Sequence, residues 1–220
     1  MNHVILVLAK APRAGAVKTR LCPPATPRAA ARIAAAALLD TLDAAAATPD
    51  AQLAVALSGD LDDAEDRVAL HAALGACTVF AQRGDNLGER IVAAHAEVAA
   101  RFPGMPVLQI GMDTPQVTPS VLRSGAAPLV AGTSDAVFGH AEDGGWWLLG
   151  LRDPLRARLI IEVPTSRPDT GARTEEALRA AGLSIHALPV LSDVDTGKDA
   201  VAVAANAPHG RFAAAVGALL

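Results

Sequence analysis

An unbroken aliphatic run, Val4-Ile5-Leu6-Val7-Leu8, lies near the N-terminus and leads into the loop Lys10-Ala11-Pro12-Arg13-Ala14-Gly15-Ala16-Val17-Lys18-Thr19-Arg20. Apolar residues without polar alternation are typical of a strand that is buried on both faces in a parallel sheet. A proline-rich turn follows the loop, and then comes an alanine-rich segment over residues 28–46. We predict a helix there because alanine is the best helix former.

The same alternation of strand and helix continues along the chain. The predicted strands cover residues 4–8, 53–57, 77–81, 107–110, 136–138, 146–151 and 184–188. The predicted helices cover residues 28–46, 62–74, 87–101 and 174–181, with further helical segments after Thr196 and after Pro208. The loop between residues 138 and 146 is too short for a helical crossover, so we expect an antiparallel pairing there. The predicted fold class is α/β: one domain over residues 1–220 with a mostly parallel, Rossmann-like sheet, helices on both faces and a short antiparallel element.

Composition narrows the classes of function. The 220 residues are 51% hydrophobic and 19% charged, with a net charge of −4. This mild acidity, without any basic run, argues against nucleic acid as the ligand. The longest apolar stretch is far shorter than the roughly 20 residues that span a membrane, and no charged-then-apolar leader opens the chain. We therefore expect a cytoplasmic protein without membrane insertion, whose separated Cys22 and Cys77 are reduced thiols.

The loop after the first strand carries four cations, Lys10, Arg13, Lys18 and Arg20, and is shaped by Gly15. Such a loop can present backbone N–H groups and fixed cationic side chains to a diphosphate, which is multiply charged. We therefore predict a phosphate-binding loop, with a solvated basic loop as the alternative. A Walker A loop and a dinucleotide fingerprint both fit poorly because the glycines that they require are missing.

Aspartates follow two other predicted strands. Gly111-Met112-Asp113-Thr114-Pro115 ends a buried strand, and Asp193-Val194-Asp195-Thr196 lies near the end of the chain. Ligands of open α/β sheets collect outside the carboxyl ends of the strands. Magnesium takes oxygen ligands from one or two carboxylates together with substrate phosphates and water. We predict that Asp113 and Asp195 hold Mg²⁺ or Mn²⁺ against the phosphates, the alternative being that each aspartate caps a following helix.

Two further polar segments are candidates for ligand contact. In Asp143-Gly144-Gly145-Trp146-Trp147, the glycines let the backbone turn sharply and approach a ligand, and Asp143 could accept hydrogen bonds from sugar hydroxyls. Adjacent strand residues point to opposite faces, so only one tryptophan can line the pocket; a hairpin turn with aromatic packing is the alternative. In Asp85-Asn86-Leu87-Gly88-Glu89-Arg90, Asp85 or Asn86 would cap a helix, and the polar side chains could also contact a base or ribose.

Taken jointly and in this order, these segments resemble the DUF2064 family, a glycosyltransferase-like branch of the nucleotide-diphospho-sugar transferases with the GT-A fold. The resemblance runs nearly end to end, from the basic loop to Asp193-Val194-Asp195-Thr196. It implies that Lys18 and Arg20 lie near the nucleotide phosphates, that Asp113 is the metal aspartate of the GT-A fold, and that Asp195 is a second ligand.

The sequence departs from the common pattern of that family at two positions. His140 stands where a proline usually precedes the Asp-Gly-Gly segment, and Trp146 replaces the usual tyrosine. Both positions are expected to line the acceptor pocket, so the acceptor stays open. The base, the sugar and the oligomeric state also stay open.

The predicted function is that of a metal-dependent transferase that binds a nucleoside diphosphate-sugar and transfers the sugar to a small-molecule acceptor. A nucleotidylyltransferase, joining an NMP from an NTP to a phosphorylated small molecule with release of pyrophosphate, is the alternative. A catalytically silent nucleotide-sugar-binding protein is the third interpretation. The predicted catalytic residues are Asp113, Lys18 and Asp143. The residues predicted to bind the nucleotide are Lys10, Arg13, Gly15, Lys18, Arg20, Asp85, Asn86, Arg90, Gly144, Gly145 and Trp146.

Overall fold

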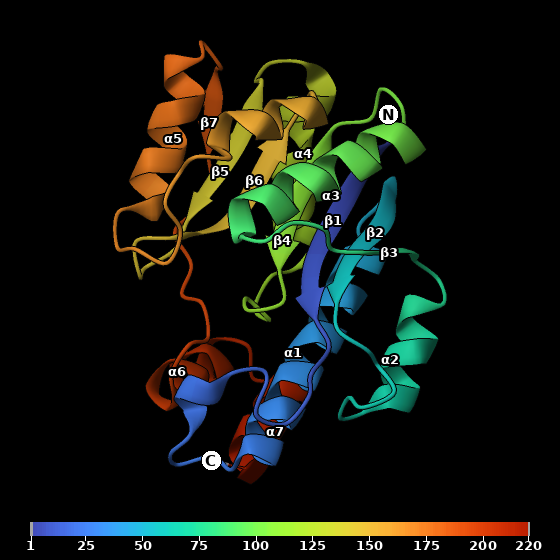
Figure 1. The fold of residues 1–220 in the computed structure, drawn as a ribbon, viewed down its shortest axis with the longest axis vertical. Coiled ribbons are helices and arrows are strands. Elements are labelled where there is room, and N and C mark those ends of the chain that lie inside the picture. The colour runs from blue at the N-terminus through green and yellow to red at the C-terminus, as the bar shows by residue number, and fades with distance from the viewer. Residues whose placement is uncertain (1, 220) are drawn as a thin grey trace.

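The aliphatic run at the N-terminus forms β1 (His3–Lys10), which lies in the interior of a seven-stranded sheet (Figure 1). The structure is a computed structural model and describes residues 2–219. Ile5 and Val7 pack into the core on one face of the sheet, and Val4 and Leu6 pack into the core on the other face. β1 is therefore buried on both faces, as its unbroken apolar sequence predicts.

The strands are arranged in the order β3-β2-β1-β4-β6-β5-β7. Besides β1 they are β2 (Ala51–Ser58), β3 (Thr78–Ala81), β4 (Val107–Gly111), β5 (Ala136–His140), β6 (Trp146–Leu151) and β7 (Ile185–Ala187). Neighbouring strands pair in parallel except that β6 pairs antiparallel with both β4 and β5. β6 alone therefore runs against the other six strands. This confirms a mostly parallel sheet with one short antiparallel element.

Helices cover both faces of the sheet (Figure 1). One face packs against α1 (Pro27–Ala46), α2 (Arg67–Leu74) and α4 (Pro119–Ala131). The other face packs against α3 (Leu87–Arg101), the 3₁₀ helix η2 (Pro154–Ile160) and α5 (Thr170–Ala180). α6 (Gly197–Asn206) and α7 (Arg211–Leu219) pack together against α1. Among the helices of residues 2–219, none has both the length and the apolar character that a membrane crossing requires.

The structure differs from the predicted helices at one boundary and by one additional helix. The predicted helix over residues 62–74 begins only at Arg67, because Asp66 adopts a left-handed backbone with φ 56° that interrupts helical geometry. α4 was not among the predicted helices. Pro128 lies inside it and Gly125 packs at its centre, and both residue types normally weaken a helix.

The strand order reverses between β1 and β4. The chain leaves β1 for β2 and β3 on one side, and then crosses through α3 to β4 on the other side of β1. In open α/β sheets, ligands bind outside the carboxyl ends of the strands at such a reversal. The fold therefore places the loop after β1 and the loop after β4 next to each other at the preferred position for a ligand.

Candidate functional site

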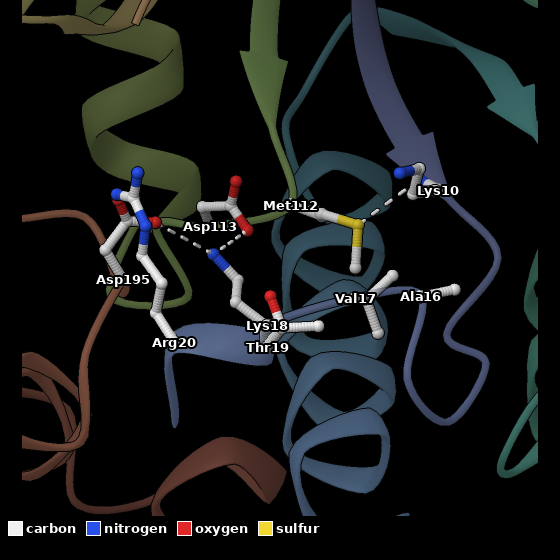
Figure 2. Close-up of a pocket in the computed structure, with 9 residues that line it drawn as sticks. All are labelled: Lys10, Ala16, Val17, Lys18, Thr19, Arg20, Met112, Asp113 and Asp195. Carbon is white, nitrogen blue, oxygen red and sulfur yellow. Dashed lines mark hydrogen bonds and ion pairs between the residues drawn. The ribbon is translucent and has the colours of Figure 1, made fainter. Parts of the chain in front are cut away.

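Lys18 lies at the centre of a charged cluster at the carboxyl ends of β1 and β4 (Figure 2). Its Nζ lies 2.5 Å from Asp113 Oδ1 and 3.7 Å from Asp195 Oδ1. The same ammonium group donates a hydrogen bond to the carbonyl of Val194. The Lys18 side chain is only 10% exposed, so these ion pairs are less screened by water than pairs on the open surface.

Three segments that are distant in sequence supply this cluster. Lys18 directly precedes the short 3₁₀ helix η1 (Thr19–Leu21) and has the left-handed backbone conformation φ 48°, ψ 38°. Asp113 follows β4, and the Val194 N–H donates to the carbonyl of Asp113 at 2.9 Å. That bond attaches the last loop of the site to the end of β4. The structure thus brings together side chains that the sequence assigned to separate loops.

A cavity of about 260 Å³ lies between the basic loop and the end of β4 (Figure 2). Its lining residues are Lys10, Ala16, Val17, Lys18, Thr19, Arg20, Met112, Asp113 and Asp195. Arg20 Nη1 lies 2.9 Å from Asp195 Oδ2, and 74% of the Arg20 side chain is exposed. The cavity therefore presents three cations beside two carboxylates, which suits a multiply charged anion.

A second, larger cavity of about 700 Å³ shares Arg20, Asp113 and Asp195 with the first. One part of its lining is polar: Arg20, Asp113, Asp143, Thr165, Ser166, Arg167, Thr170, Thr174, Asp193, Asp195, Thr196 and Asp199. Another part is apolar and is formed by Leu8, Leu87, Gly88, Ile91, Ile160 and Val163. The three shared residues therefore form a common wall between the smaller and the larger cavity.

Asp143, Asp193 and Asp195 form a carboxylate group that lines the larger cavity and includes one residue of the common wall, Asp195. Each offers an oxygen that lies within 4.8 Å of an oxygen of the other two. Burial, together with the negative charges of Asp143 and Asp195, raises the pKa of Asp193 to about 6. Hard oxygen ligands at this spacing fit Mg²⁺ or Mn²⁺, whose charge would offset the repulsion among them.

The two aspartates predicted as metal ligands lie on different sides of this arrangement. Asp195 is one of the three grouped carboxylates, whereas Asp113 is not a member of the group and pairs with Lys18. Lys18 therefore lies between Asp113 and Asp195, at 2.5 Å from one carboxylate and 3.7 Å from the other.

Close backbone packing fixes the loop that carries Asp143. A Cβ atom on Gly144, which has φ 88°, would lie 1.9 Å from the carbonyl oxygen of Pro168, and one on Gly171 would lie 2.3 Å from that of Gly145. The Gly171 N–H donates to the Gly144 carbonyl at 2.8 Å. Asp143 Oδ1 accepts a hydrogen bond of 2.7 Å from the Gly145 N–H. Glycine is therefore needed at both contact positions to hold Asp143 at the cavity.

The two tryptophans have different environments. Trp147 is 3% exposed, packs in the core, and donates its indole N–H to the Pro189 carbonyl at 3.0 Å. Trp146 is half-buried, packs near Phe138, and borders the larger cavity. Although both residues border the larger cavity, Trp147 is a core residue and Trp146 is the one available to a ligand, in line with the alternation expected of a strand.

The other cations predicted in the basic loop are spread over its length. Lys10 borders the smaller cavity. Arg13 instead pairs with Asp63 at 3.8 Å, and both side chains are well exposed. Gly15, with φ 75°, shapes the turn, and a Cβ added to it would meet no other atom of residues 2–219 within 4 Å. Lys18 and Arg20 are therefore the loop residues that lie closest to the carboxylates.

The segment around Asn86 serves the start of α3. Asn86 caps the helix by accepting a hydrogen bond from the Glu89 N–H at 2.9 Å, and the Asp85 N–H donates to the Glu89 carboxylate at 2.7 Å. Arg90 donates to the carbonyl of Gly84. None of Asp85, Asn86 and Arg90 is among the described residues that line the two cavities. The predicted helix cap at Asn86 is confirmed, and contact of this segment with a base or ribose stays a prediction.

Two residues of the site, Asp193 and Gln109, are not among the site residues predicted from sequence. Asp193 stands two positions before Asp195, and two carboxylates at alternate positions were a visible signal for both of them. Gln109 borders the larger cavity from within β4, and its signal was a polar residue inside an otherwise apolar strand.

Comparison with protein families identifies the chain. The model of the family described as "Uncharacterized protein conserved in bacteria (DUF2064)" matches residues 41–167, more than half of the sequence. The chain belongs to the DUF2064 family. This confirms the resemblance drawn from the motifs, and it includes the loop with Asp143 and the end of β4. No curated protein matches this DUF2064 chain.

Solved structures show the same fold. A Desulfovibrio desulfuricans protein, named only provisionally as a nucleotide-diphospho-sugar transferase, is 28% identical with a TM-score of 0.83, and the match covers 98% of this chain and 94% of that chain. CMP:2-keto-3-deoxy-manno-octonic acid synthetase in complex with CTP is 14% identical with a TM-score of 0.59, covering 94% and 99%. Rv0371c from Mycobacterium tuberculosis, in complex with manganese, is 20% identical with a TM-score of 0.54, covering 90% and 96%. The DUF2064 chain therefore has a nucleotide-diphospho-sugar transferase-like fold.

Proposed function

We propose that this DUF2064 protein is a metal-dependent transferase that binds a nucleoside diphosphate-sugar and transfers the sugar to a small-molecule acceptor. The observation that carries the proposal is the common wall of Arg20, Asp113 and Asp195, with a cation-rich cavity on one side and a larger, carboxylate-lined cavity on the other. A donor diphosphate in the smaller cavity would place its sugar next to an acceptor in the larger one.

The charged residues of the two cavities have distinct roles in this proposal. The bond between the anomeric carbon and the diphosphate oxygen breaks, and the acceptor oxygen bonds to that carbon. Lys18 and Arg20 offset the charge that grows on the leaving diphosphate. Asp143, the exposed member of the carboxylate group, accepts hydrogen bonds from sugar hydroxyls and takes the proton lost by the acceptor hydroxyl.

Asp195 is the proposed centre of a Mg²⁺ or Mn²⁺ site. It is grouped with Asp143 and Asp193, and it also faces Asp113 across Lys18. A bound divalent cation would supply Lewis-acid stabilisation of the leaving diphosphate. The manganese in the Rv0371c structure supports a divalent ion in this fold. The cation could be held by Asp195 together with Asp193 or by Asp195 together with Asp113. Asp193→Asn and Asp113→Asn distinguish these two ligand sets, because the true partner of Asp195 is the one whose loss weakens Mn²⁺ binding.

A nucleotidylyltransferase is the second candidate, because the CMP:2-keto-3-deoxy-manno-octonic acid synthetase with CTP shares this fold. In that reaction a phosphorylated small molecule attacks the α-phosphate of an NTP and pyrophosphate leaves. The larger cavity, however, places five carboxylates beside two arginines: Asp113, Asp143, Asp193, Asp195, Asp199, Arg20 and Arg167. This excess of negative charge favours a neutral, hydroxyl-bearing acceptor over a phosphorylated one.

A panel of nucleotides tests the proposal. Thermal stabilisation and calorimetric binding are measured for nucleoside diphosphate-sugars and for NTPs, each with Mg²⁺, with Mn²⁺ and with EDTA. We expect metal-dependent stabilisation by at least one nucleoside diphosphate-sugar, and release of the nucleoside diphosphate when acceptor alcohols are added.

Three results would contradict this function. A preference for NTP with pyrophosphate release would favour nucleotidyl transfer. Metal-independent binding without turnover would favour a silent binding protein. If Asp113→Ala, Asp193→Ala and Asp195→Ala all left metal-dependent nucleotide binding unchanged, the role given to these carboxylates would be wrong.

A further inference from the structure

Gln109 is the polar residue of an otherwise apolar buried strand. In β4, Val107, Leu108 and Ile110 are fully buried, and Gln109 is only 3% exposed. A buried amide costs free energy unless both its oxygen and its nitrogen find partners. The environment of Gln109 therefore indicates whether the amide serves the fold alone or also serves a ligand.

The oxygen of Gln109 is taken by a buried histidine. His95 on α3 is fully buried, and its Nε2 lies 2.9 Å from Gln109 Oε1. Burial lowers the pKa of His95 to about 4, so the ring is neutral near pH 7. His95 Nδ1 has no hydrogen-bond partner within residues 2–219. A buried N–H without a partner is rarer than a buried acceptor without one, so the proton belongs on Nε2, from which it is donated to Gln109.

This pairing leaves the amide nitrogen of Gln109 as a donor. With Oε1 held by His95, the NH₂ group makes no hydrogen bond to any of residues 2–219, and Gln109 borders the larger cavity. The donor is thus oriented by a residue that itself does not reach the cavity. Such an orientation is specific, because a free amide could rotate to present either its oxygen or its nitrogen.

The cavity wall near Gln109 is apolar. Gln109 contacts His95 on α3, and the apolar cluster of Leu8, Ile91, Ile160 and Val163 that packs on this side of the sheet lines the same cavity, as does Leu87. α3 and η2 approach so closely that a Cβ on Gly88 would lie 2.7 Å from the Ile161 carbonyl oxygen, so the wall is fixed by backbone contact. An apolar recess with one convergent donor is the usual construction of a small-molecule site.

We propose that this end of the larger cavity binds an apolar portion of the acceptor, and that the Gln109 amide donates a hydrogen bond to a neutral oxygen on that portion. His95 acts as the positioning residue that keeps the donor turned toward the ligand. That this ligand is the acceptor substrate rests on the proposed transferase function. The presence of an apolar recess with an oriented donor does not depend on that function.

Acetophenone and ethylbenzene are matched probes for this recess, because they have similar size and only the first carries a carbonyl oxygen. Their dissociation constants are measured by ligand-observed NMR, and the ¹⁵N side-chain amide signal of Gln109 is followed in the same titrations. We expect the wild-type protein to bind acetophenone about three- to tenfold more tightly than ethylbenzene, the range expected for one neutral hydrogen bond.

Gln109→Glu is the matched variant. When its carboxyl group is ionised, it keeps an oxygen that accepts from His95 and has no donor, so the preference for acetophenone should disappear while the affinity for ethylbenzene stays within about twofold. Gln109→Met removes both groups and should also lose the preference. In His95→Phe the amide is free to rotate, so we expect a smaller preference with unchanged ethylbenzene binding.

Two outcomes would overturn the inference: equal binding of the two probes by the wild-type protein, or a preference that survives in Gln109→Met. An unperturbed Gln109 amide signal at saturation would do the same. Binding of nucleoside diphosphate-sugars with Mn²⁺ is measured separately on the same variants. If that binding is absent while the preference for acetophenone holds, the proposed transferase function fails and the Gln109 recess stands.

Discussion

Lys18 joins two loops of the site through a single ammonium group. Its ammonium group contacts the loop after β4 through Asp113, and the loop before α6 through Val194 and Asp195. The chain contains only three lysines, and Lys10 and Lys18 both line the smaller cavity. Water screens the ion pair of Lys18 less than it screens a pair on the open surface. The pair also holds a cation where an incoming phosphate could bind.

Replacing Lys18 with methionine should weaken nucleotide binding while sparing the fold. Methionine keeps the length of the side chain and removes its charge, and Asp113 stays partly solvated at 43% exposure. We expect a nucleoside diphosphate to bind about ten- to hundredfold more weakly, as measured by isothermal titration calorimetry. Lys198→Met removes an exposed lysine of α6 and is the control. Equal affinities of the two variants would refute the role given to Lys18.

His95 makes a prediction about pH. Its pKa is about 4 in the folded protein and about 6.5 in the unfolded chain, so the unfolded state binds the proton first as pH falls. The free energy of unfolding should therefore drop between about pH 6.5 and pH 4, by up to about 3 kcal/mol from this residue. Urea unfolding of the wild-type protein and of His95→Phe, measured across this range, checks it. The two pH profiles should converge toward pH 4; parallel profiles would contradict the prediction.

Some residues of the site could be predicted from the sequence, and others could not. Lys18, Arg20, Asp113 and Asp195 could be picked out because they are charged, scarce or adjacent to strand ends, and the structure places all four on one cavity. Which of them pair with each other could not be read from sequence, because a pairing depends on how loops from different strands meet. The oriented amide of Gln109 needs a partner on α3, fourteen residues earlier, which no local pattern reveals.

Helices and strands were predicted correctly where a single apolar pattern dominated their sequence. The helix over residues 87–101 and the strand over residues 146–151 were predicted with the bounds of α3 and β6, because each has a clear apolar pattern. α4 was not predicted, and its internal proline and glycine weaken the helical signal of its sequence. Its start did carry a signal, since Thr118 caps the helix and Pro119 occupies the first position. Tertiary packing of Leu122, Ala126 and Leu129 into the core overrides the weak propensity.

The close contact between the loops of Gly144 and Pro168 leads to a prediction about stability. Gly144→Ala adds a Cβ that would lie 1.9 Å from the Pro168 carbonyl, so the loop of Asp143 must move. We expect a loss of more than about 3 kcal/mol in the free energy of unfolding, together with weaker Mn²⁺ binding. Gly182→Ala is the matched control because Gly182 also has a positive φ, but a Cβ there would meet no atom of residues 2–219 within 4 Å. It should cost only about 1 kcal/mol. Similar losses in the two variants, measured by urea unfolding, would show that the loop contact is unimportant.

The reversal of strand order between β1 and β4 explains why the smaller and the larger cavity share one wall. Loops after β1 and β4 meet at the reversal, and the antiparallel β6 brings the Asp143 loop to the same edge, because its N-terminal end lies where the parallel strands end. The loop before α6 then closes the arrangement through the hydrogen bond between Val194 and Asp113. The alanine-rich α1 contributes packing to the core beneath this edge and no side chain to either cavity as lined by residues 2–219.

A shared wall implies that ligands on its two sides affect each other. If a divalent ion binds at Asp195 and a diphosphate binds beside Arg20, each should raise the affinity of the other by the same factor, about fivefold to a hundredfold. Titration calorimetry of Mn²⁺ with and without a nucleoside diphosphate, and of the nucleotide with and without Mn²⁺, gives both factors. Asp195→Asn should bring the factor close to one, whereas Asp62→Asn, at an exposed position away from both cavities, should leave it unchanged. A coupling factor that persists in Asp195→Asn would mean that the cation and the nucleotide meet elsewhere.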